Sequence, residues 1–314
     1  MRLERFDLNL LVALEALLRT KSVSATALEL RLTQPAVSSA LARLRAHFGD
    51  EIFIFSGGEM TPTEFGRSLA GTVTDLVAQL RPLARARARF DPSSLHRAFK
   101  IIASDYVSQV LLSRVSRRLA LLAPNVSLQV ISFSDNAASQ FDRGNIDFQI
   151  APEFMASANR RAETLFSDNF RCVVSATNVF VEACLDVATF KRLPHIVTSF
   201  GVHDGKSHFE RELETKNIRI SVAAMVPSFV LLPYFVIGTQ NIATVHRRLI
   251  DELPVDLPLR YFDVPIEIPD LTGVLYWNKY LDRDMEAMWL RDLIIETGKS
   301  LETSVGMPIV GRGE

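Results

Sequence analysis

Residues 22–48 read SVSATALELRLTQPAVSSALARLRAHF, and this stretch decides the fold. Its pattern predicts two short helices joined by a tight turn. Ser22 or Ser24 can cap the first helix, because a serine side chain accepts a hydrogen bond from the first helical turn. Thr33 can cap the second helix, and Pro35 lies in its first turn, where a missing N–H costs nothing.

The second helix has two different faces. Its apolar residues fall on one side, and the opposite face is small, polar and basic. Small side chains let a helix approach base edges closely, and Gln, Ser and Arg can hydrogen-bond there. This is the layout of a helix-turn-helix whose recognition helix is the second. The alternative is an αα-hairpin with an ordinary solvated face. The outer face holds Gln34, Pro35, Ser38, Ala42 and Arg45, flanked by Ser39 and Arg43.

Motifs beyond the helix pair favour the first interpretation. LTQPAVS at residues 32–38 is followed by EIF at 51–53, by TPT at 61–63 and by Gly66. This series closely resembles the N-terminal domain of LysR-type transcriptional regulators, in its helix caps, its core positions and its wing. The resemblance implies that the chain binds double-stranded DNA.

The helical arc and the family's use of matching positions together predict the DNA-binding residues. Gln34, Pro35 and Ser38 are expected to face the major groove, and the basic residues to hold or flank phosphate. Arg31 stands at a turn position where glycine is common in the family, so a left-handed backbone there costs on the order of 1 kcal/mol. The full predicted set is Arg31, Thr33, Gln34, Pro35, Ser38, Ser39 and Arg43.

The predicted wing departs from the family pattern. Residues 56–58 read SGG between two strand-like segments, which indicates a hairpin. Many family members carry a basic residue in this wing, and this chain has Phe55 and the SGG turn instead. The wing is therefore expected to contact phosphates through backbone N–H groups alone, or to grip DNA weakly.

A long helix should follow the wing. Thr61, Pro62 and Glu64 form a predicted capping box. Apolar residues then recur with spacings of 4, 3, 4 and 3, which is the pattern of a coiled coil and predicts a dimer. The alternative is a helix packed on its own domain. Pro82 should kink or end the helix near Gln79. The predicted dimerisation seam is Leu69, Val73, Leu76, Leu80 and Leu83.

Composition sets broad limits. The chain has 314 residues, 48% of them hydrophobic, which suits two or three soluble domains. Residues 1–90 hold 12 Lys and Arg against 9 Asp and Glu, and the rest holds 23 against 27. Cys172 and Cys184 fit no metal motif and are expected to be buried filler in a reducing cytoplasm. No signal peptide is expected at the N-terminus.

From Phe99 onward, strand-like segments alternate with helical ones, which predicts a parallel α/β sheet. The segment 220–245 carries no charge, but its two prolines argue against a membrane helix. Residues 133–135, 144–148 and 276–280 extend the resemblance toward the branch with the nodulation regulators and the salicylate- and nitroaromatic-responsive activators. That branch implies an effector domain of two α/β subdomains, like a periplasmic binding protein.

The chain is then expected to cross between the subdomains near residues 164–171 and 262–271, with the ligand in the cleft between them. The expected domains are a winged helix-turn-helix at 1–62, a linker helix and hinge at 63–92, and an effector-binding domain at 93–314. Within the last, subdomain I is expected at about 93–165 and 268–314, and subdomain II at about 166–267.

A small aromatic or phenolic effector is the hypothesis for that cleft. The family branch has aromatic inducers, and ligands of α/β sheets lie at the carboxyl ends of strands. An apolar slot with a few polar groups would result. Taken singly, Phe229 and Tyr276 fit plain core as well as ligand contact. The predicted effector-binding residues are Ser104, Asn169, His203, Phe229 and Tyr276.

No catalytic signature is present. The GKS sequences at 205–207 and 298–300 lack the first glycine of a P-loop. HDGKSH at 203–208 has no matching ligand cluster elsewhere, so no metal or cofactor is predicted. The chain is expected to be a cytoplasmic bacterial regulator, not an enzyme, that forms a dimer or tetramer without a membrane partner. RNA polymerase is a further candidate partner. The alternative is a small-molecule-binding or enzymatic α/β protein whose N-terminal helices mediate only partner contacts.

Overall fold

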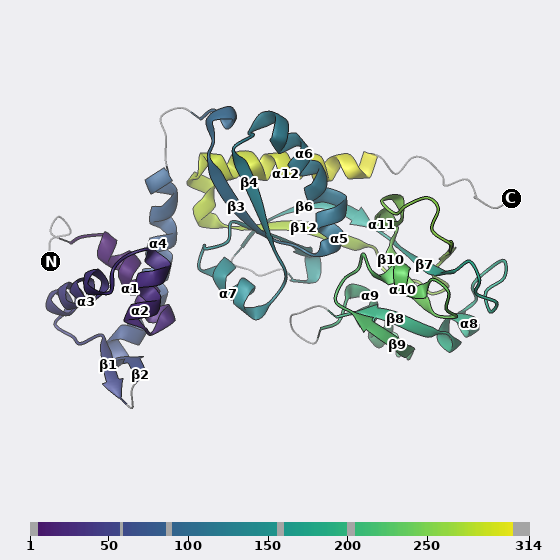
Figure 1. The fold of residues 1–314 in the computed structure, drawn as a ribbon, viewed down its shortest axis with the longest axis horizontal. Coiled ribbons are helices and arrows are strands. Elements are labelled where there is room, and N and C mark those ends of the chain that lie inside the picture. The colour runs from purple at the N-terminus through teal and green to yellow at the C-terminus, as the bar shows by residue number, and fades with distance from the viewer. Residues whose placement is uncertain (1–5, 57–58, 86–89, 156–159, 200–204, 304–314) are drawn as a thin grey trace. The chain divides into compact units, whose positions relative to one another are not determined.

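A computed structural model describes residues 6–56, 59–85, 90–155, 160–199 and 205–303. The chain forms two compact units, Met1–Ala86 (unit 1) and Arg87–Glu314 (unit 2) (Figure 1). The long helix after the wing belongs to unit 1, and the α/β part of the chain makes up unit 2.

Unit 1 is a bundle of helices with a two-stranded hairpin. Its apolar core joins three N-terminal helices, the hairpin and the long fourth helix, with Leu14, Val37 and Leu44 wholly buried. The elements are α1 (Asn9–Thr20), α2 (Val23–Leu30), α3 (Gln34–Phe48), β1 (Phe53–Ser56), β2 (Glu59–Pro62) and α4 (Glu64–Arg85). The predicted helix pair and its order are confirmed.

Side-chain caps fix the two helices of the pair. Ser22 Oγ accepts a hydrogen bond from the Ala25 N–H at 3.2 Å, and Thr33 Oγ1 accepts one from the Ala36 N–H at 3.4 Å. Arg31 ends α2 in the left-handed conformation, with φ of 55°. The turn between the helices is therefore set locally by these three residues.

Two predictions about α4 are wrong. Thr61 lies in β2, and the cap is Thr63, whose Oγ1 accepts a hydrogen bond from the Gly66 N–H at 2.9 Å. The helix begins two residues later than predicted because β2 pairs with β1 as far as Pro62. The helix also does not end near Gln79, because it continues to Arg85, while the alternative that Pro82 kinks it stays a prediction. One proline removes a single backbone hydrogen bond, and the rest of the helix tolerates that loss.

Unit 2 contains two mixed five-stranded sheets, which define a first and a second subdomain (Figure 1). The first sheet has the order β4-β3-β5-β12-β6, with β3 (Arg97–Ile102), β4 (Val126–Ile131), β5 (Phe148–Pro152), β6 (Arg160–Asp168) and β12 (Leu271–Asn278). The second has the order β11-β7-β10-β8-β9, with β7 (Phe170–Ser175), β8 (Pro194–Thr198), β9 (Ser221–Val226), β10 (Ile242–His246) and β11 (Leu259–Asp263).

The prediction of purely parallel sheets is wrong. β12 pairs antiparallel with β5 and β6, and β7 pairs antiparallel with β10 and β11. The chain passes between the subdomains twice, from β6 directly to β7 and from β11 directly to β12. A chain that enters one sheet directly from the other, with no crossover helix, is free to pair antiparallel.

Helices cover both sheets of unit 2. α6 and α12 lie beside the first sheet, and their sequence positions are far apart (Figure 1). The helices are α5 (Asp105–Val107), a π-helical turn (Ser108–Leu112), α6 (Ser113–Leu122), α7 (Asp135–Asp142), α8 (Val187–Arg192), α9 (His208–Thr215), α10 (Leu232–Val236), α11 (Arg247–Asp251) and α12 (Met285–Thr303). Short 3₁₀ turns occupy Pro92–Ser94, Glu153–Met155 and Lys279–Arg283.

The uncharged segment 220–245 folds as a strand, the short helix α10 and another strand. Within the described residues, no helix combines the length and the apolar character that crossing a bilayer requires. Cys172 is buried in β7, as expected, whereas Cys184 is exposed, so the prediction that both cysteines are buried is half wrong. Cys184 precedes Asp186, the cap of α8, in a surface connection.

Candidate nucleic-acid interface and effector cavity

The outer face of α3 is exposed in unit 1. All seven residues predicted to bind DNA are classed as exposed: Arg31, Thr33, Gln34, Pro35, Ser38, Ser39 and Arg43. The opposite face holds Val37, Leu41 and Leu44 in the core. The core therefore fixes the rotation of α3 and presents its small, polar and basic side chains to solvent.

Two of these residues have additional contacts. Thr33 is the cap of α3, so its hydroxyl accepts a hydrogen bond from the helix and is only partly available to DNA. Arg43 forms an ion pair with Asp7, with Nη2 2.9 Å from Oδ2, while its side chain remains 56% exposed. An exposed pair of this kind is weak, so Arg43 can exchange its partner for a phosphate.

The hairpin of β1 and β2 is attached to α3 by Arg45. Its Nε donates to the Glu51 carbonyl at 2.8 Å, and Nη2 donates to the Phe53 carbonyl at 3.1 Å. Arg45 therefore positions the hairpin, a role that its place on the outer helical arc did not indicate. Ile54 and Phe55 are 50% and 67% exposed on β1.

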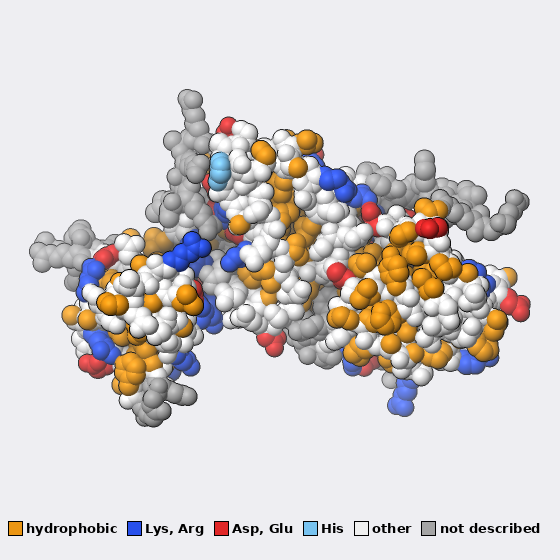
Figure 2. Space-filling view, viewed as in Figure 1, with side chains coloured by type: hydrophobic (Ala, Val, Ile, Leu, Met, Phe, Trp, Pro, Cys, Tyr) orange, Lys and Arg blue, Asp and Glu red, His pale blue; other side chains and the backbone are white. Residues whose placement is uncertain are grey.

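Basic side chains are spread over the visible face of unit 1, without a single dense patch (Figure 2). The modest charge excess of residues 1–90 agrees with this picture. Charge alone would not identify the DNA-binding surface, and the shape and chemistry of α3 carry the assignment.

The residues of the apolar seam predicted for dimerisation differ in their exposure. Val73 is 3% exposed within the core of unit 1, and Leu69 and Leu80 pack partly against the same core. Leu76 is 41% exposed. The side chain of Leu83 lies outside the described residues. Most of the seam therefore packs on its own unit, which leaves Leu76 as the member that a second chain can reach.

A cavity lies in unit 2 where the two subdomains meet. Its volume is about 630 Å³, which includes the space at its mouth that is open to solvent. Its walls come from both sheets and from α5 and α9. The lining residues are Ser104, Tyr106, Val107, Phe133, Ile150, Ala151, Pro152, Phe154, Met155, Phe166, Lys206, Ser207, His208, Arg211, Phe229, His246, Leu271 and Gly273.

Two of the five predicted effector residues, Ser104 and Phe229, line this cavity. Asn169 does not, because it lies at the passage between the sheets, where its carbonyl accepts a hydrogen bond from the Arg247 N–H at 2.8 Å. Tyr276 does not line it either. His203 lies outside the described residues.

The alternation of side chains along a strand explains why Tyr276 does not line the cavity. Successive side chains of a strand point to opposite faces, so Gly273 and Leu275 share one face of β12 while Val274 and Tyr276 share the other. Gly273 lines the cavity, and Tyr276 is 1% exposed in a separate apolar cluster. The glycine keeps room at this wall, since a Cβ there would come within 3.1 Å of the Phe166 ring.

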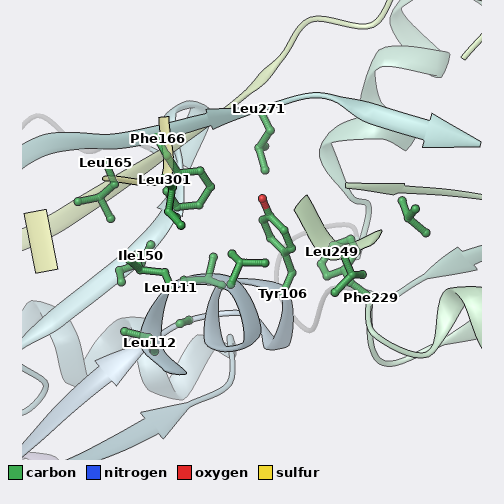
Figure 3. Packing of buried hydrophobic residues seen from close by; sticks show 14 of the residues in the cluster. Tyr106, Leu111, Leu112, Ile150, Leu165, Phe166, Phe229, Leu249, Leu271 and Leu301 are labelled. Carbon is green, nitrogen blue, oxygen red and sulfur yellow. The ribbon is translucent and has the colours of Figure 1, made fainter. Parts of the chain in front are cut away.

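Tyr106 was not predicted, yet it lines the cavity. Figure 3 shows its ring among buried apolar side chains that include Phe229 and Leu271. Its hydroxyl donates a hydrogen bond to Asp168 Oδ2 at 2.5 Å, and the Arg248 N–H donates to the same oxygen at 3.2 Å. Burial raises the pKa of Asp168 to about 6, although these hydrogen bonds act in the opposite direction. Burial and the nearby Asp168 also raise the pKa of Tyr106.

Aromatic rings surround His246 on the wall of the cavity. The Tyr106 ring stacks on it with centroids 3.9 Å apart and planes inclined by 12°, and Phe229 meets it edge-on at 4.9 Å. Burial lowers the pKa of His246 to about 3. The imidazole is therefore neutral at physiological pH.

Basic groups from α9 and the residues before it lie at another part of the wall. The His208 ring stacks between Phe154 and Phe170, at 5.7 and 5.9 Å, and the Arg211 guanidinium lies 5.4 Å from the Phe154 centroid. Lys206 forms an ion pair with Glu214. The cavity thus combines planar apolar walls with a cationic edge.

A more polar hollow adjoins the cavity and shares Ser104, Phe133 and Phe229 with it. Beside it, Asp105 of the first subdomain accepts hydrogen bonds from Ser228 Oγ at 2.5 Å and from the Val230 N–H at 2.9 Å. These bonds connect the two subdomains next to the cavity. Among the described residues, no group of three or more His, Cys, Asp or Glu is arranged to hold a metal ion.

Comparisons with known proteins identify the family of both parts of the chain. Residues 8–67 match the family model of the bacterial regulatory helix-turn-helix protein, lysR family, and residues 92–299 match the LysR substrate binding domain. Nodulation protein D 1 of Bradyrhizobium elkanii is 33% identical over 302 residues, covering 96% of each chain. Nodulation protein D 1 of Sinorhizobium fredii is 34% identical, over 96% of this chain and 94% of its own.

Solved structures share the architecture. A probable transcriptional regulator of Pseudomonas aeruginosa is 27% identical, with a TM-score of 0.61, over 93% of this chain and 97% of its own. Full-length OxyR of the same organism gives a TM-score of 0.69 at 14% identity, over 94% and 95% of the two chains, which supports the fold alone.

Proposed function

The chain belongs to the LysR family of bacterial transcriptional regulators, and we propose that it reads operator DNA through α3 and responds to a small aromatic effector in the cavity of unit 2. The DNA-binding part of the proposal depends on the exposed face of α3. That face carries small side chains around Gln34 and Ser38, so the helix can approach the floor of the major groove.

The effector part depends on the composition of the cavity. Tyr106, Phe166 and Phe229 offer flat apolar surfaces, and a few polar and cationic groups interrupt them. Pockets of this kind hold planar organic molecules, with the polar groups fixing their orientation. The similarity to nodulation proteins D 1 supports the expectation of phenolic or benzoate-like effectors.

DNA recognition is tested by recovering the genomic fragments that bind the full chain and titrating one of them by fluorescence anisotropy at several salt concentrations. We expect log K to fall linearly with log salt, because phosphate contacts release counterions. An unrelated fragment should bind more weakly at every salt concentration. Equal affinity for both fragments would contradict operator recognition.

The effector is tested by a thermal-shift screen of benzoates, salicylates, hydroquinones and flavonoids against the full chain. A ligand present at 100 times its Kd should stabilise the protein by about 2.7 kcal/mol. A screen in which only sugars or amino acids raise the Tm would overturn the aromatic effector. It would leave the DNA-binding proposal unaffected.

A further inference from the structure

His246 on the cavity wall has a buried ring nitrogen that no group of the described residues satisfies. Nδ1 of His246 is buried and has no hydrogen-bond partner among the residues that the structure describes. The side chain is 4% exposed, and its ring lines both the main cavity and a second hollow behind it. Buried polar groups are nearly always hydrogen-bonded, so an exception on a cavity wall points to a group that arrives from outside the protein.

The surroundings of His246 are aromatic. Tyr106 stacks on one side at 3.9 Å, Phe229 meets the ring at 4.9 Å, and Phe170 lies 5.1 Å away. These rings hold the imidazole in place. They also make the local environment apolar, which strengthens any hydrogen bond that a ligand forms there.

The protonation state narrows the ligand chemistry. Burial lowers the pKa of His246, with a smaller effect from nearby His208, so the ring is neutral near pH 7. A neutral imidazole has one donor and one acceptor nitrogen. A hydroxyl can both donate and accept, so it satisfies either tautomer. A carboxylate at the same place would be desolvated beside an uncharged ring.

We infer that His246 selects the effector by hydrogen-bonding, through its imidazole, to a phenolic hydroxyl on an aromatic ring that lies against Tyr106 and Phe229. The inference deepens the proposed function and rests on it, because it assigns a chemical group to the effector of the same cavity. His246 is a specificity residue in this proposal, and the flat walls supply most of the affinity.

The experiment compares matched probes by isothermal titration calorimetry on the full chain. The probe pairs are 4′-hydroxyflavanone with flavanone, and 4-hydroxybenzoate with benzoate, and each pair differs by one hydroxyl group. We expect the hydroxylated member of at least one pair to bind the wild-type chain at least about fivefold more tightly, as one buried hydrogen bond allows. This comparison requires no variant, so it does not depend on how a substitution folds.

Two variants then locate the contact. His246→Leu should remove the preference for the hydroxylated probe, and His246→Asn should retain most of it, because the asparagine amide can occupy the place of Nδ1. His195→Leu is the matched control. His195 is another buried histidine of the second sheet, but its Nε2 already lies 2.9 Å from the Phe190 carbonyl. The control should keep the preference.

The outcomes separate the two proposals. Equal binding of both members of each pair to the wild-type chain would overturn the role of His246 and leave the aromatic effector standing. A hydroxyl preference that survives His246→Leu would do the same. Absence of binding by all four probes would overturn the His246 inference, and the thermal-shift screen would decide separately on the aromatic effector.

Discussion

Gln34 and Ser38 carry hydrogen-bonding groups on the exposed face of α3, one turn apart. We expect Gln34→Ala and Ser38→Ala each to cost about 1–3 kcal/mol of discrimination between operator and non-operator DNA. Anisotropy titrations against both DNAs measure this difference. Gln79→Ala makes the same chemical change on exposed α4 and should leave the discrimination unchanged. Wild-type discrimination by both α3 variants would refute the assignment.

Asp168 provides a test based on pH. Its folded pKa is about 6 against an ordinary value of 3.8, so its contribution to stability is fully present below about pH 4 and is lost as pH rises through 6. Asp168→Asn cannot ionise and still accepts from the Tyr106 hydroxyl. The variant should gain on the order of 3 kcal/mol over the wild-type chain at pH 8, and only about 1 kcal/mol near pH 4.5.

Urea unfolding at both pH values measures this gain through tryptophan fluorescence. Trp277 and Trp289 are the two tryptophans of the chain, and both belong to unit 2, so the signal reports the unit that contains Asp168. Asp263→Asn changes a carboxylate whose side chain is 86% exposed, and it serves as the control. A gain for Asp168→Asn that is equal at both pH values would contradict the assignment.

At the residue scale, the sequence allowed some side chains to be placed correctly and not others. The face of α3 could be predicted because helical period and caps are local properties, read from consecutive residues. Tyr276 could not be placed, because a shift of one position along β12 moves a side chain to the opposite face of the sheet. Tyr106 was missed for a related reason, since its hydrogen bond to Asp168 joins residues 62 positions apart.

Among the elements, the junction between the hairpin and α4 is the most tightly constrained. Ile52 has φ of 60°, which is rare for a β-branched residue, and its carbonyl accepts a hydrogen bond from the Thr63 N–H at 2.8 Å. Gly66 approaches the same carbonyl, and a Cβ on it would lie 2.4 Å from the Ile52 oxygen. The glycine therefore allows α4 to begin directly against the strained turn.

Gly66→Ala should destabilise unit 1 by about 2–3 kcal/mol, because the clash involves backbone that cannot rotate away. Gly71→Ala is the control on the same helix. Its Cβ would have no neighbour within 4 Å, so it should stabilise unit 1 by about 0.5–1 kcal/mol. Far-UV circular dichroism follows both variants, since unit 1 has no tryptophan. Equal melting of the two variants would show that the contact is unimportant.

The elements of unit 2 were predictable in order and not in pairing. The alternation of apolar runs and amphipathic segments indicates that strands and helices alternate along the chain, and the apolar run that forms β10 illustrates this. The pattern is weaker in β6 and β11, because each lies beside a passage between subdomains, where polar residues interrupt the apolar run. Antiparallel pairing of β12 depends on the path of the whole chain, which no local pattern encodes.

At the scale of the whole molecule, the helix that ends unit 1 is the candidate surface for assembly. Most of the predicted seam is occupied, because Val73 is buried in the core of unit 1 and Leu69 and Leu80 pack against it. Leu76 differs from them in being 41% exposed. We therefore propose that two chains associate through the exposed face of α4, with Leu76 in the contact. Two recognition helices held in this way would read half-sites roughly 34 Å apart.

Leu76→Glu should dissociate the dimer without unfolding the chain, because the carboxylate would be desolvated against an apolar partner in the dimer and remain hydrated in the monomer. Multi-angle light scattering measures the change in mass, and Leu76→Met, which keeps an apolar side chain of similar volume, should retain the wild-type mass. If chains also associate through unit 2, the measured mass should fall from that of a tetramer to that of a dimer, and not to that of a monomer. In either case, binding to a DNA fragment with two half-sites should weaken, since the two recognition helices then bind independently. An unchanged mass for Leu76→Glu at the same protein concentration would exclude α4 as the pairing surface.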